Sequence, residues 1–235
     1  MTSACLPGTG TERALLAGGC ATVAGIDEVG RGAWAGPVSV GVAVVTLETL
    51  SCLPEGVRDS KLLTERAREA LFAPLAAALT AYAVGHASAQ ECDALGLTAA
   101  QRLAADRALD SLGQVPAALI VDGCHDYTGR GALPLVGADR RSLVVAAASV
   151  LAKVTRDRLM AAAAERHPGY GFERNKGYPS AEHRRAVARL GLTSLHRRTW
   201  SVGVTGRSLL EADQDGGARP LDRRAAPIAS EAGAV

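Results

Sequence analysis

The sequence predicts an α/β fold in which a mixed β-sheet is flanked by helices and followed by a C-terminal helical lobe. Apolar runs of strand length, at residues 21–27 and 117–122 for example, alternate with longer segments of helical character. A short glycine-rich link follows the first run, so it should pair antiparallel with the next. The run at 117–122 ends in Asp-Gly and resembles a buried parallel strand. Both strand directions are therefore expected in one sheet.

The individual elements follow from local signals along the chain. Valines at alternate positions favour a strand over residues 36–47, and Thr64 is a predicted N-cap whose helix Pro74 should kink or end. The first half of the helix predicted over 142–166 is apolar all round and should be buried. Further strands are expected at 81–88 and 133–136, and further helices at 89–95, 98–112 and 180–190.

The chain of 235 residues, 48% of them hydrophobic, is long enough for one main domain with a substantial core. Residues 1–20 have no clear period and are interpreted as a flexible leader. The main domain is expected over 21–200, with a basic helical lobe from about residue 167. Residues 201–235 turn to Gly, Ala, Asp and Arg without a period, which is typical of a disordered tail.

Composition excludes several classes of protein. The apolar stretches fall well short of the roughly 20 residues that a membrane-spanning helix needs. The N-terminus lacks the ordered regions of a signal peptide, so a cytoplasmic location is expected. The five cysteines are an odd number without close pairs, which indicates free thiols rather than a disulfide or zinc scaffold.

Charge is distributed unevenly along the chain. The net charge is only +2, yet residues 153–198 hold eleven Lys or Arg and four Asp or Glu, a balance of +7. Such asymmetry points to a polyanionic partner, although a basic helical stretch can also be an ordinary solvated face.

The most informative stretch is Gly25 to Pro37, where Asp27 and Glu28 end an apolar run and glycines follow at once. Successive side chains of a strand point to opposite faces, so two adjacent carboxylates can meet at one ion only where the strand ends or bends. Gly30 and Gly32 would permit that bend and a close approach to a ligand, while Arg31 offers a guanidinium suited to phosphate. The ordinary alternative is an acidic turn capped by glycine.

Two further carboxylates complete a candidate metal site, namely Asp122 at the end of the 117–122 strand and Asp139 before the long helix. Like charges gathered together raise one another's pKa, and a hard divalent cation such as Mg²⁺ or Mn²⁺ offsets that cost. Two such ions can activate a water and stabilise the leaving oxygen of a phosphodiester, so no nucleophilic side chain is required. His125, close to Asp122, is a further candidate ligand whose ordinary interpretation is a solvated loop histidine.

Several blocks of the sequence together resemble the ribonuclease HII family, over roughly residues 22–200. They are Gly25 to Val38, Asp59-Ser60-Lys61, residues 146–158 (AAASVLAKVTRDR), Asn175-Lys176-Gly177-Tyr178 and His196-Arg197-Arg198. The resemblance implies a ribonuclease H-like fold and a nuclease that cuts the ribonucleotide-containing strand of an RNA/DNA hybrid or of DNA with an embedded ribonucleotide.

The resemblance also assigns roles to particular residues. Asp27, Glu28, Asp122 and Asp139 would form the metal site, the first three most clearly, because Gly137-Ala138 stands where the family usually has Lys-Gly. Asp126 and Asp157 are alternatives for the fourth carboxylate, with a solvated loop and a surface ion pair as their ordinary roles. The implied substrate-binding residues are Gly30, Arg31, Gly32, Lys61, Lys153 and Tyr178. In the family the matching tyrosine stacks on the sugar at the ribonucleotide-to-deoxyribonucleotide junction.

The expected function is therefore Mg²⁺- or Mn²⁺-dependent cleavage on the 5′ side of a ribonucleotide, by a monomer whose partners are RNA/DNA hybrids and ribonucleotide-containing duplex DNA. Two alternatives differ in class. A related four-carboxylate DNA nuclease should lack the Gly-Arg-Gly and Lys-Gly-Tyr blocks. A non-catalytic nucleic-acid-binding protein would not need carboxylates at strand ends. Lys153 has an alternative of its own, since it could extend from the buried helix to solvent, and Tyr178 could be only a packing residue.

Overall fold

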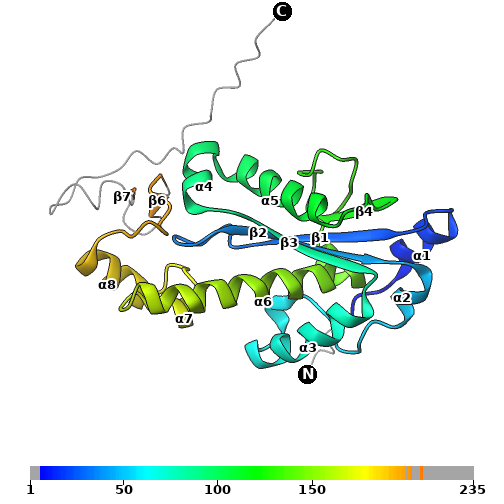
Figure 1. Cartoon of the computed structure of the whole chain (residues 1–235), viewed down its shortest axis with the longest axis horizontal. Helices are drawn as coiled ribbons and strands as arrows, with labels where there is room; N and C mark the ends of the chain where they lie inside the picture. Colours follow the sequence, from blue (N-terminus) through cyan, green and yellow to red (C-terminus); the bar gives the residue numbers. More distant parts are fainter. Residues whose placement is uncertain (1–5, 200, 203–206, 209–235) are drawn as a thin grey trace, which may run out of the picture.

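A five-stranded mixed sheet forms the centre of the molecule (Figure 1). The computed structural model describes residues 6–199, 201–202 and 207–208. The strands run β3-β2-β1-β4-β5 across the sheet. β2 is antiparallel to its neighbours β1 and β3, and β4 and β5 run parallel to β1, which confirms the predicted mixed sheet. Their bounds are β1 Val23–Val29, β2 Val38–Val45, β3 Ala81–Ala87, β4 Ala118–Asp122 and β5 Leu133–Leu135.

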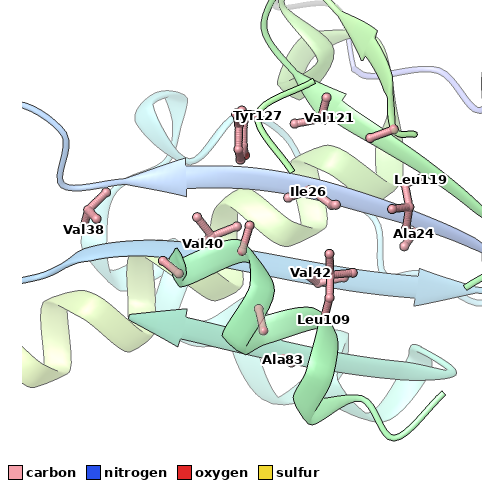
Figure 2. Packing of buried hydrophobic residues seen from close by; sticks show 14 of the residues in the cluster. Ala24, Ile26, Val38, Val40, Val42, Ala83, Leu109, Leu119, Val121 and Tyr127 are labelled. Carbon is pink, nitrogen blue, oxygen red and sulfur yellow. The ribbon is translucent and has the colours of Figure 1, made fainter. Parts of the chain in front are cut away.

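Helices cover both faces of the sheet (Figure 1). One face carries α4 (Ala89–Leu95) and α5 (Leu97–Ser111), which pack on Ile26, Val40 and Val42 (Figure 2). The other face carries the long helix α6 (Leu143–Arg166), whose first half is buried as predicted. Helices α1 (Gly10–Ala17), α2 (Leu47–Ser51) and α3 (Glu65–Ala78) add apolar residues to the core on this face, and short 3₁₀ helices lie at Ser60–Leu62 (η1) and Ala138–Arg140 (η2).

Helix α6 lies so close to the sheet that glycine is required beneath it. A Cβ atom on Gly25 of β1 would lie 2.4 Å from the backbone carbon of Val144, and one on Gly41 of β2 would lie 2.5 Å from the carbonyl oxygen of Ala148. Interiors packed at this density do not yield to added volume without displacement of the backbone. The position of α6 relative to β1 is therefore fixed two residues before Asp27.

The C-terminal lobe consists of α7 (Phe172–Asn175) and α8 (Ala181–Leu190), packed on the second half of α6 through Trp34, Met160 and Phe172. Backbone hydrogen bonds fasten the lobe to the segment that follows β1. The amide of Gly36 donates to the carbonyl of Leu195 at 2.8 Å, and the amide of Arg197 donates to that of Trp34 at 2.8 Å. The lobe is thus attached to the chain just after the glycine-rich stretch.

The segment expected to be a leader contains helix α1, which differs from the expectation for residues 1–20. Its anchor is Glu12, a fully buried carboxylate that accepts hydrogen bonds from the Ser142 hydroxyl at 2.6 Å and the Val144 amide at 3.1 Å, at the start of α6. Negative charge at a helix N-terminus is favourable. A single buried carboxylate leaves no apolar period in the sequence, which explains why periodicity did not indicate this helix.

Three local boundaries also differ from expectation. Pro74 lies inside α3, which continues to Ala78 rather than ending at the proline. The strand expected to reach residue 47 stops at Val45, because Thr46 caps a short helix, α2. Ser201–Val202 (β6) and Arg207–Ser208 (β7) form a small antiparallel pair within the predicted tail, and the disorder predicted for 209–235 lies outside the described residues. Among the described helices, none combines the length and the apolarity that crossing a membrane requires.

Candidate active site

Strands β1 and β4 bring three of the predicted carboxylates to one end of the sheet. The two strands are parallel neighbours with Ile26 opposite Val121, so Asp27 and Asp122 occupy the next register position. Side chains alternate along a strand, and Val23 of β1 and Ile120 of β4 belong to the core beneath α6. By the same alternation, Asp27 and Asp122 lie on the face of the sheet that packs against α6. Glu28 lies with Ile26 on the opposite face, which packs against α5. Strand β1 runs on to Val29, so no bend turns the adjacent carboxylates to one side, contrary to expectation.

Asp27 is almost fully buried against α6, with 3% of its surface exposed. Burial raises the pKa of its carboxyl well above the ordinary value, and the charge of Glu28 raises it further. One carboxylate oxygen accepts from the Glu28 amide at 2.9 Å, and the nearby hydroxyl of Ser149 from α6 acts to lower the pKa of the same carboxyl. Ser149 also lies 2.8 Å from the hydroxyl of Ser60, so the carboxylate is held by a small hydroxyl network that the sequence patterns did not indicate.

Glu28 faces a second set of polar groups on the α5 side. Burial raises the pKa of Glu28, while the guanidinium of Arg31 acts against that shift. Tyr127 lies on this face with the apolar residues of β1 and β2 (Figure 2), and its pKa is raised well above the usual range by burial and by the charge of Glu28. Gln101 of α5 accepts a hydrogen bond from Arg31. Tyr127 and Gln101 are further residues near the site that sequence reasoning missed.

Asp122 and Asp139 meet at η2. The carboxylate of Asp122 accepts from the amide of Ala138 at 2.7 Å, which is possible because Gly137 turns the chain with a φ of +66°. Asp139 is buried, and its pKa is raised by that burial and by the nearby charge of Asp59. The ammonium of Lys61 lies 3.4 Å from Asp139. A lysine from η1 therefore stands beside the fourth carboxylate, where the preceding residues Gly137 and Ala138 supply none.

The predicted carboxylates share one end of the sheet, but they do not form a complete metal-coordination site. Within the described part of the chain, no three Asp, Glu, His or Cys side chains are grouped tightly enough to hold one ion. The four do interact electrostatically, since the charge of Asp122 raises the pKa values of Asp27, Glu28 and Asp139 alike. The assignment of these four residues as metal ligands stays a prediction.

A pocket of about 200 Å³ opens beside Asp27 and Glu28. All six residues predicted to bind substrate line it, although they come from four separate parts of the sequence. The lining is formed by Asp27, Glu28, Val29, Gly30, Arg31, Gly32, Ser60, Lys61, Lys153 and Tyr178. Carboxylates, cations, a glycine-containing turn and an aromatic ring thus share one cavity.

The two glycines of the turn at residues 30–32 differ in what surrounds them. Gly30 is buried with a φ of +88°, and a Cβ there would lie 2.3 Å from Nε of Arg156 and 2.7 Å from the Pro37 carbonyl. Gly32 is exposed, and a Cβ added there would have no other atom within 4 Å. Packing within the protein therefore accounts for Gly30, whereas the backbone at Gly32 is open to an incoming ligand.

Two buried arginines hold this turn and the Tyr178 segment in place. Arg156 of α6 is fully buried and donates to the carbonyls of Pro37 at 2.9 Å, Lys176 at 2.9 Å and Ala35 at 3.1 Å. Arg197, also fully buried, donates to carbonyls within the turn region, those of Gly30 at 2.7 Å, Arg31 at 3.0 Å and Gly36 at 3.1 Å. Both arginines belong to the basic excess predicted to bind a polyanion, but their guanidinium groups bind backbone instead.

Tyr178 is half-buried and lines the pocket. The guanidinium of Arg156 lies 5.3 Å from the ring centroid, and the ammonium of Lys153 lies 5.6 Å from it. Both distances are within the range of cation–π attraction. Lys153 also forms an ion pair with Asp157 at 2.7 Å. Its positive charge is therefore partly compensated within the protein, although the residue lines the pocket.

The alternative carboxylates and the candidate histidine have other partners. Asp157 is buried rather than on the surface, and it pairs with Lys153 and, at 3.7 Å, with Arg68. Asp126 accepts hydrogen bonds from the Thr128 hydroxyl and from four backbone amides within its own loop, and the bonds from the Thr128 hydroxyl and loop amides lower its pKa. His125 is exposed and lies 3.3 Å from the thiol of Cys124. These contacts explain Asp126 and Asp157 without a metal.

Part of the positive charge over residues 153–198 is compensated by ion pairs within the protein. Arg158 pairs with Glu69, Arg174 with Glu173 and Glu182, and Lys176 with Glu65. Exposed arginines on α8 are Arg184, Arg185 and Arg189. The surface charge that remains for a polyanion is therefore concentrated on α8.

Comparison with known proteins gives consistent results. The family model described as Ribonuclease HII matches residues 24–202. The ribonuclease HII of Streptomyces avermitilis is 50% identical over 193 residues, covering 81% of this chain and 82% of the relative, and that of Paracoccus denitrificans is 48% identical over 200 residues, covering 83% and 92%. The crystal structure of ribonuclease H2 from Pyrococcus horikoshii superposes with a TM-score of 0.67 at 29% identity, covering 82% of this chain and 97% of that one.

The match spans the carboxylates, the 30–32 turn, the pocket lysines and Tyr178 in one continuous alignment range, and the fold agrees with that of the solved relative. The chain therefore belongs to the ribonuclease HII family of endonucleases, which hydrolyse RNA in RNA/DNA hybrids.

Proposed function

We propose that this chain removes ribonucleotides from DNA, cutting on the 5′ side of a single embedded ribonucleotide as well as within the RNA strand of a hybrid. The products would carry a 3′-hydroxyl and a 5′-phosphate. The observation that carries the proposal is the pocket in which Asp27 and Glu28 lie beside the 30–32 turn and Tyr178. Such a pocket can combine hydrolysis of a phosphodiester with recognition of the sugar next to it. The enzyme would act as a cytoplasmic monomer.

The donor set at the sheet end fits Mg²⁺ or Mn²⁺. All four side chains, those of Asp27, Glu28, Asp122 and Asp139, offer carboxylate oxygens, which hard divalent cations prefer. The raised pKa values of Asp27, Glu28 and Asp139 reflect an electrostatic cost that a bound cation would offset. When bound, the metal ions would supply activation of the attacking water and stabilisation of the leaving oxygen.

The chain's own groups would position the substrate around that chemistry. Lys61, whose side chain is 71% exposed, and Arg31 at the pocket rim carry positive charge toward a phosphate. The open backbone at Gly32 supports contact with a 2′-hydroxyl, the group that distinguishes RNA from DNA. Lys153 would add positive potential from the side of α6.

Tyr178 would recognise the nucleotide on the 3′ side of the ribonucleotide. Its ring can stack on a deoxyribose, which has no 2′-oxygen to collide with it, so the turn and the ring together would select a ribonucleotide followed by a deoxyribonucleotide. Stacking of this kind is worth about 1–3 kcal/mol by alanine substitution, so Tyr178→Ala should slow cleavage at a single embedded ribonucleotide by roughly 5- to 150-fold. A uniform hybrid should be affected less, because its next sugar fits the ring poorly.

The proposal is tested with an end-labelled duplex carrying one ribonucleotide, incubated with Mg²⁺ or Mn²⁺ and with EDTA. Cleavage should occur on the 5′ side of the ribonucleotide and should stop in EDTA. An all-DNA duplex of the same sequence is the matched substrate control. Cutting of the all-DNA duplex at a similar rate would instead favour the four-carboxylate DNA nuclease, and an intact labelled strand under every condition would favour the non-catalytic binding protein.

A further inference from the structure

A pair of buried histidines joins α8 to the segment that follows it. His183 is fully buried and His196 is 2% exposed, and their Nε2 atoms lie 3.1 Å apart. Aromatic rings surround them, since Phe172 lies 5.3 Å from the ring of His183 and Tyr170 lies 5.3 Å from the ring of His196. Neither histidine is among the residues that line the pocket, so the nuclease chemistry does not explain them.

The hydrogen bonds fix the protons of both rings. The backbone amide of Thr193 can only donate, and it points at Nδ1 of His196 at 2.9 Å, so this nitrogen is the acceptor. The proton of neutral His196 is then on Nε2, which donates to Nε2 of His183. His183 in turn carries its proton on Nδ1 and donates it to the carbonyl oxygen of Tyr178 at 2.9 Å. One directed chain of hydrogen bonds, called the relay below, therefore runs from Thr193 through His196 and His183 to Tyr178.

The environment keeps both rings neutral. Burial lowers the pKa of His183, and burial together with the neighbouring His183 lowers the pKa of His196 to about 3. A proton added to either ring would put two donors face to face or remove the acceptor for Thr193. The chain of bonds is thus compatible only with the neutral pair.

The chain of bonds begins at Tyr178, which lines the pocket, and leads to the segment that pairs with the residues after the 30–32 turn. At one end is Tyr178, whose carbonyl also accepts from the amide of Ser180 at 2.8 Å. At the other end His196 pairs with Ala35 in an isolated β-bridge, between Leu195, which binds Gly36, and Arg197, whose side chain binds the carbonyls of the 30–32 turn. The two histidine side chains thus connect the Tyr178 segment to the segment that follows the 30–32 turn.

We propose that His183 and His196 are positioning residues that set the placement of Tyr178 relative to the 30–32 turn. The inference rests on the proposed function, in which the turn contacts the ribose and Tyr178 contacts the next sugar. With the relay intact, the Tyr178 carbonyl is held by two donors, next to the bonds that the Gly177 carbonyl accepts from the amides of Trp34 at 2.9 Å and Ala35 at 3.2 Å. Without it, the Tyr178 carbonyl keeps only the donor from Ser180, so the ring is placed less precisely while the carboxylates keep their contacts.

Substitutions at His183 separate the two bonds of the relay. His183→Asn places an amide donor near the position of Nδ1 and should keep the bond to Tyr178. His183→Gln should keep the bond to His196 and lose the one to Tyr178. A net hydrogen bond of about 1 kcal/mol predicts that His183→Gln lowers the preference for a single ribonucleotide over a uniform hybrid by roughly 3- to 10-fold. The preference of His183→Asn should stay near that of the wild type.

A double-mutant cycle with Tyr178→Ala separates positioning from general stability. The measured quantity is the ratio of kcat/KM on the single-ribonucleotide duplex to kcat/KM on the uniform hybrid. If His183 acts through Tyr178, adding His183→Gln to Tyr178→Ala should leave this ratio unchanged, even where the double variant is less stable to urea. A ratio that falls equally in both backgrounds, or does not fall in either, overturns the positioning role.

Failure of the relay and failure of the proposed function have different signatures. If Tyr178→Ala itself leaves the ratio unchanged, the proposed recognition of the junction is wrong and the positioning role is overturned with it. If Tyr178→Ala changes the ratio and His183→Gln does not, only the relay is wrong. Nitrogen-15 NMR of the imidazoles gives a check independent of activity, because the assigned tautomers require an unprotonated Nδ1 on His196 and a protonated Nδ1 on His183. Any other pair of tautomers contradicts the relay.

Discussion

Two groups of charged residues near the pocket have opposite electrostatic environments. On the carboxylate side, formed by Asp27, Glu28, Asp122 and Asp139, anions gather at one end of the sheet, and burial raises the pKa values of Asp27, Glu28 and Asp139. On the arginine side, formed by Arg156, Arg197 and the backbone they bind, each buried cation donates to three carbonyl groups. The first side is electrostatically unfavourable in the protein alone, whereas the second is largely satisfied.

The difference indicates which side is built for chemistry and which for shape. Perturbed carboxylates at a cavity are typical of functional sites, because the interaction that relieves them comes from outside the chain. Arginines whose guanidinium groups are hydrogen-bonded to the protein's own backbone stabilise a particular backbone geometry without a ligand. Substitutions on the two sides should therefore separate activity from stability, and the predictions below are ordered by the size of the expected effect.

The largest effect is expected on the carboxylate side. Asp27→Asn and Asp122→Asn keep the size of the side chain and remove its charge, so cleavage should fall by roughly 100-fold or more, as when one group that stabilises transition-state charge is removed. Melting temperatures should not fall in parallel, because each substitution removes one of several mutually repelling charges. Asp139→Asn should have a milder effect, since Gly137 and Ala138 precede it in place of the family's usual Lys-Gly.

The matched control for these variants is Asp110→Asn, which removes a carboxylate that is 67% exposed and pairs with Arg130 away from the pocket. Its cleavage rate should equal that of the wild type. Full activity of both Asp27→Asn and Asp122→Asn would show that these carboxylates do not form the metal site.

The reverse pattern is expected on the arginine side. Arg156→Met keeps a long apolar stem but leaves the carbonyls of Ala35, Pro37 and Lys176 without their donor. Each buried carbonyl left unsatisfied costs about 1–3 kcal/mol, so the free energy of unfolding in urea should fall by about 3 kcal/mol or more. Arg158→Met on the same helix removes an exposed ion pair with Glu69 and should change the free energy of unfolding by less than about 1 kcal/mol. Equal losses in the two variants would contradict the structural role of Arg156.

The carboxylate side should also make stability depend on pH when divalent ions are removed. Asp27, Glu28 and Asp139 have pKa values raised in the folded protein, so their contribution to stability is complete below their ordinary values, near 4, and is lost as the pH rises through the folded values. In EDTA the melting temperature of the wild type should therefore fall, as the pH rises above about 4, relative to that of Asp27→Asn. Mg²⁺ should reduce this gap, and parallel curves with and without Mg²⁺ would argue against the site.

The smallest effect is expected on the exposed face of α8. Each phosphate that is neutralised contributes about 0.9 to the slope of log K against log salt concentration on duplex DNA, so Arg184→Ala with Arg185→Ala should flatten the slope by at most about 2. Binding is best measured in the Asp27→Asn background, where the substrate should stay intact. Arg107→Ala, which removes a partner of Glu91, is the control. An unchanged slope in the double variant would return this pair of arginines to an ordinary solvated face.

Sequence patterns predicted those parts of the molecule whose causes are local. Strands such as β2 follow from alternating valines, and Asp27 and Asp122 could be placed because apolar runs end at them. The chain's own motifs could not show that Asp27 and Glu28 leave β1 on opposite faces, since that depends on β1 continuing straight to Val29. The family resemblance supplied the residues of the pocket, which are far apart in sequence.

The parts that sequence patterns missed depend on single long-range contacts. Arg197 binds carbonyls 166 and 167 residues away, and Glu12 binds groups 130 and 132 residues away, so neither leaves a periodic or spaced signal. Buried histidines such as His183 have the same difficulty, because their partners are the backbone of Tyr178 and a second histidine. A charge or an imidazole in the sequence does not reveal whether its partner is a ligand or the protein's own backbone.

Helix α6 contributes to both sides of the pocket, which restricts how its sequence can change in length. Ser149 reaches Asp27, and Lys153 and Arg156 reach the wall that carries Tyr178, about one and two turns further along. An α-helix advances about 1.5 Å and rotates about 100° per residue. A single inserted or deleted residue between Ser149 and Lys153 would therefore rotate one wall away from the other while every contacting side chain remained in the chain. Homologues should vary α6 by substitution and leave the spacing of these residues unchanged.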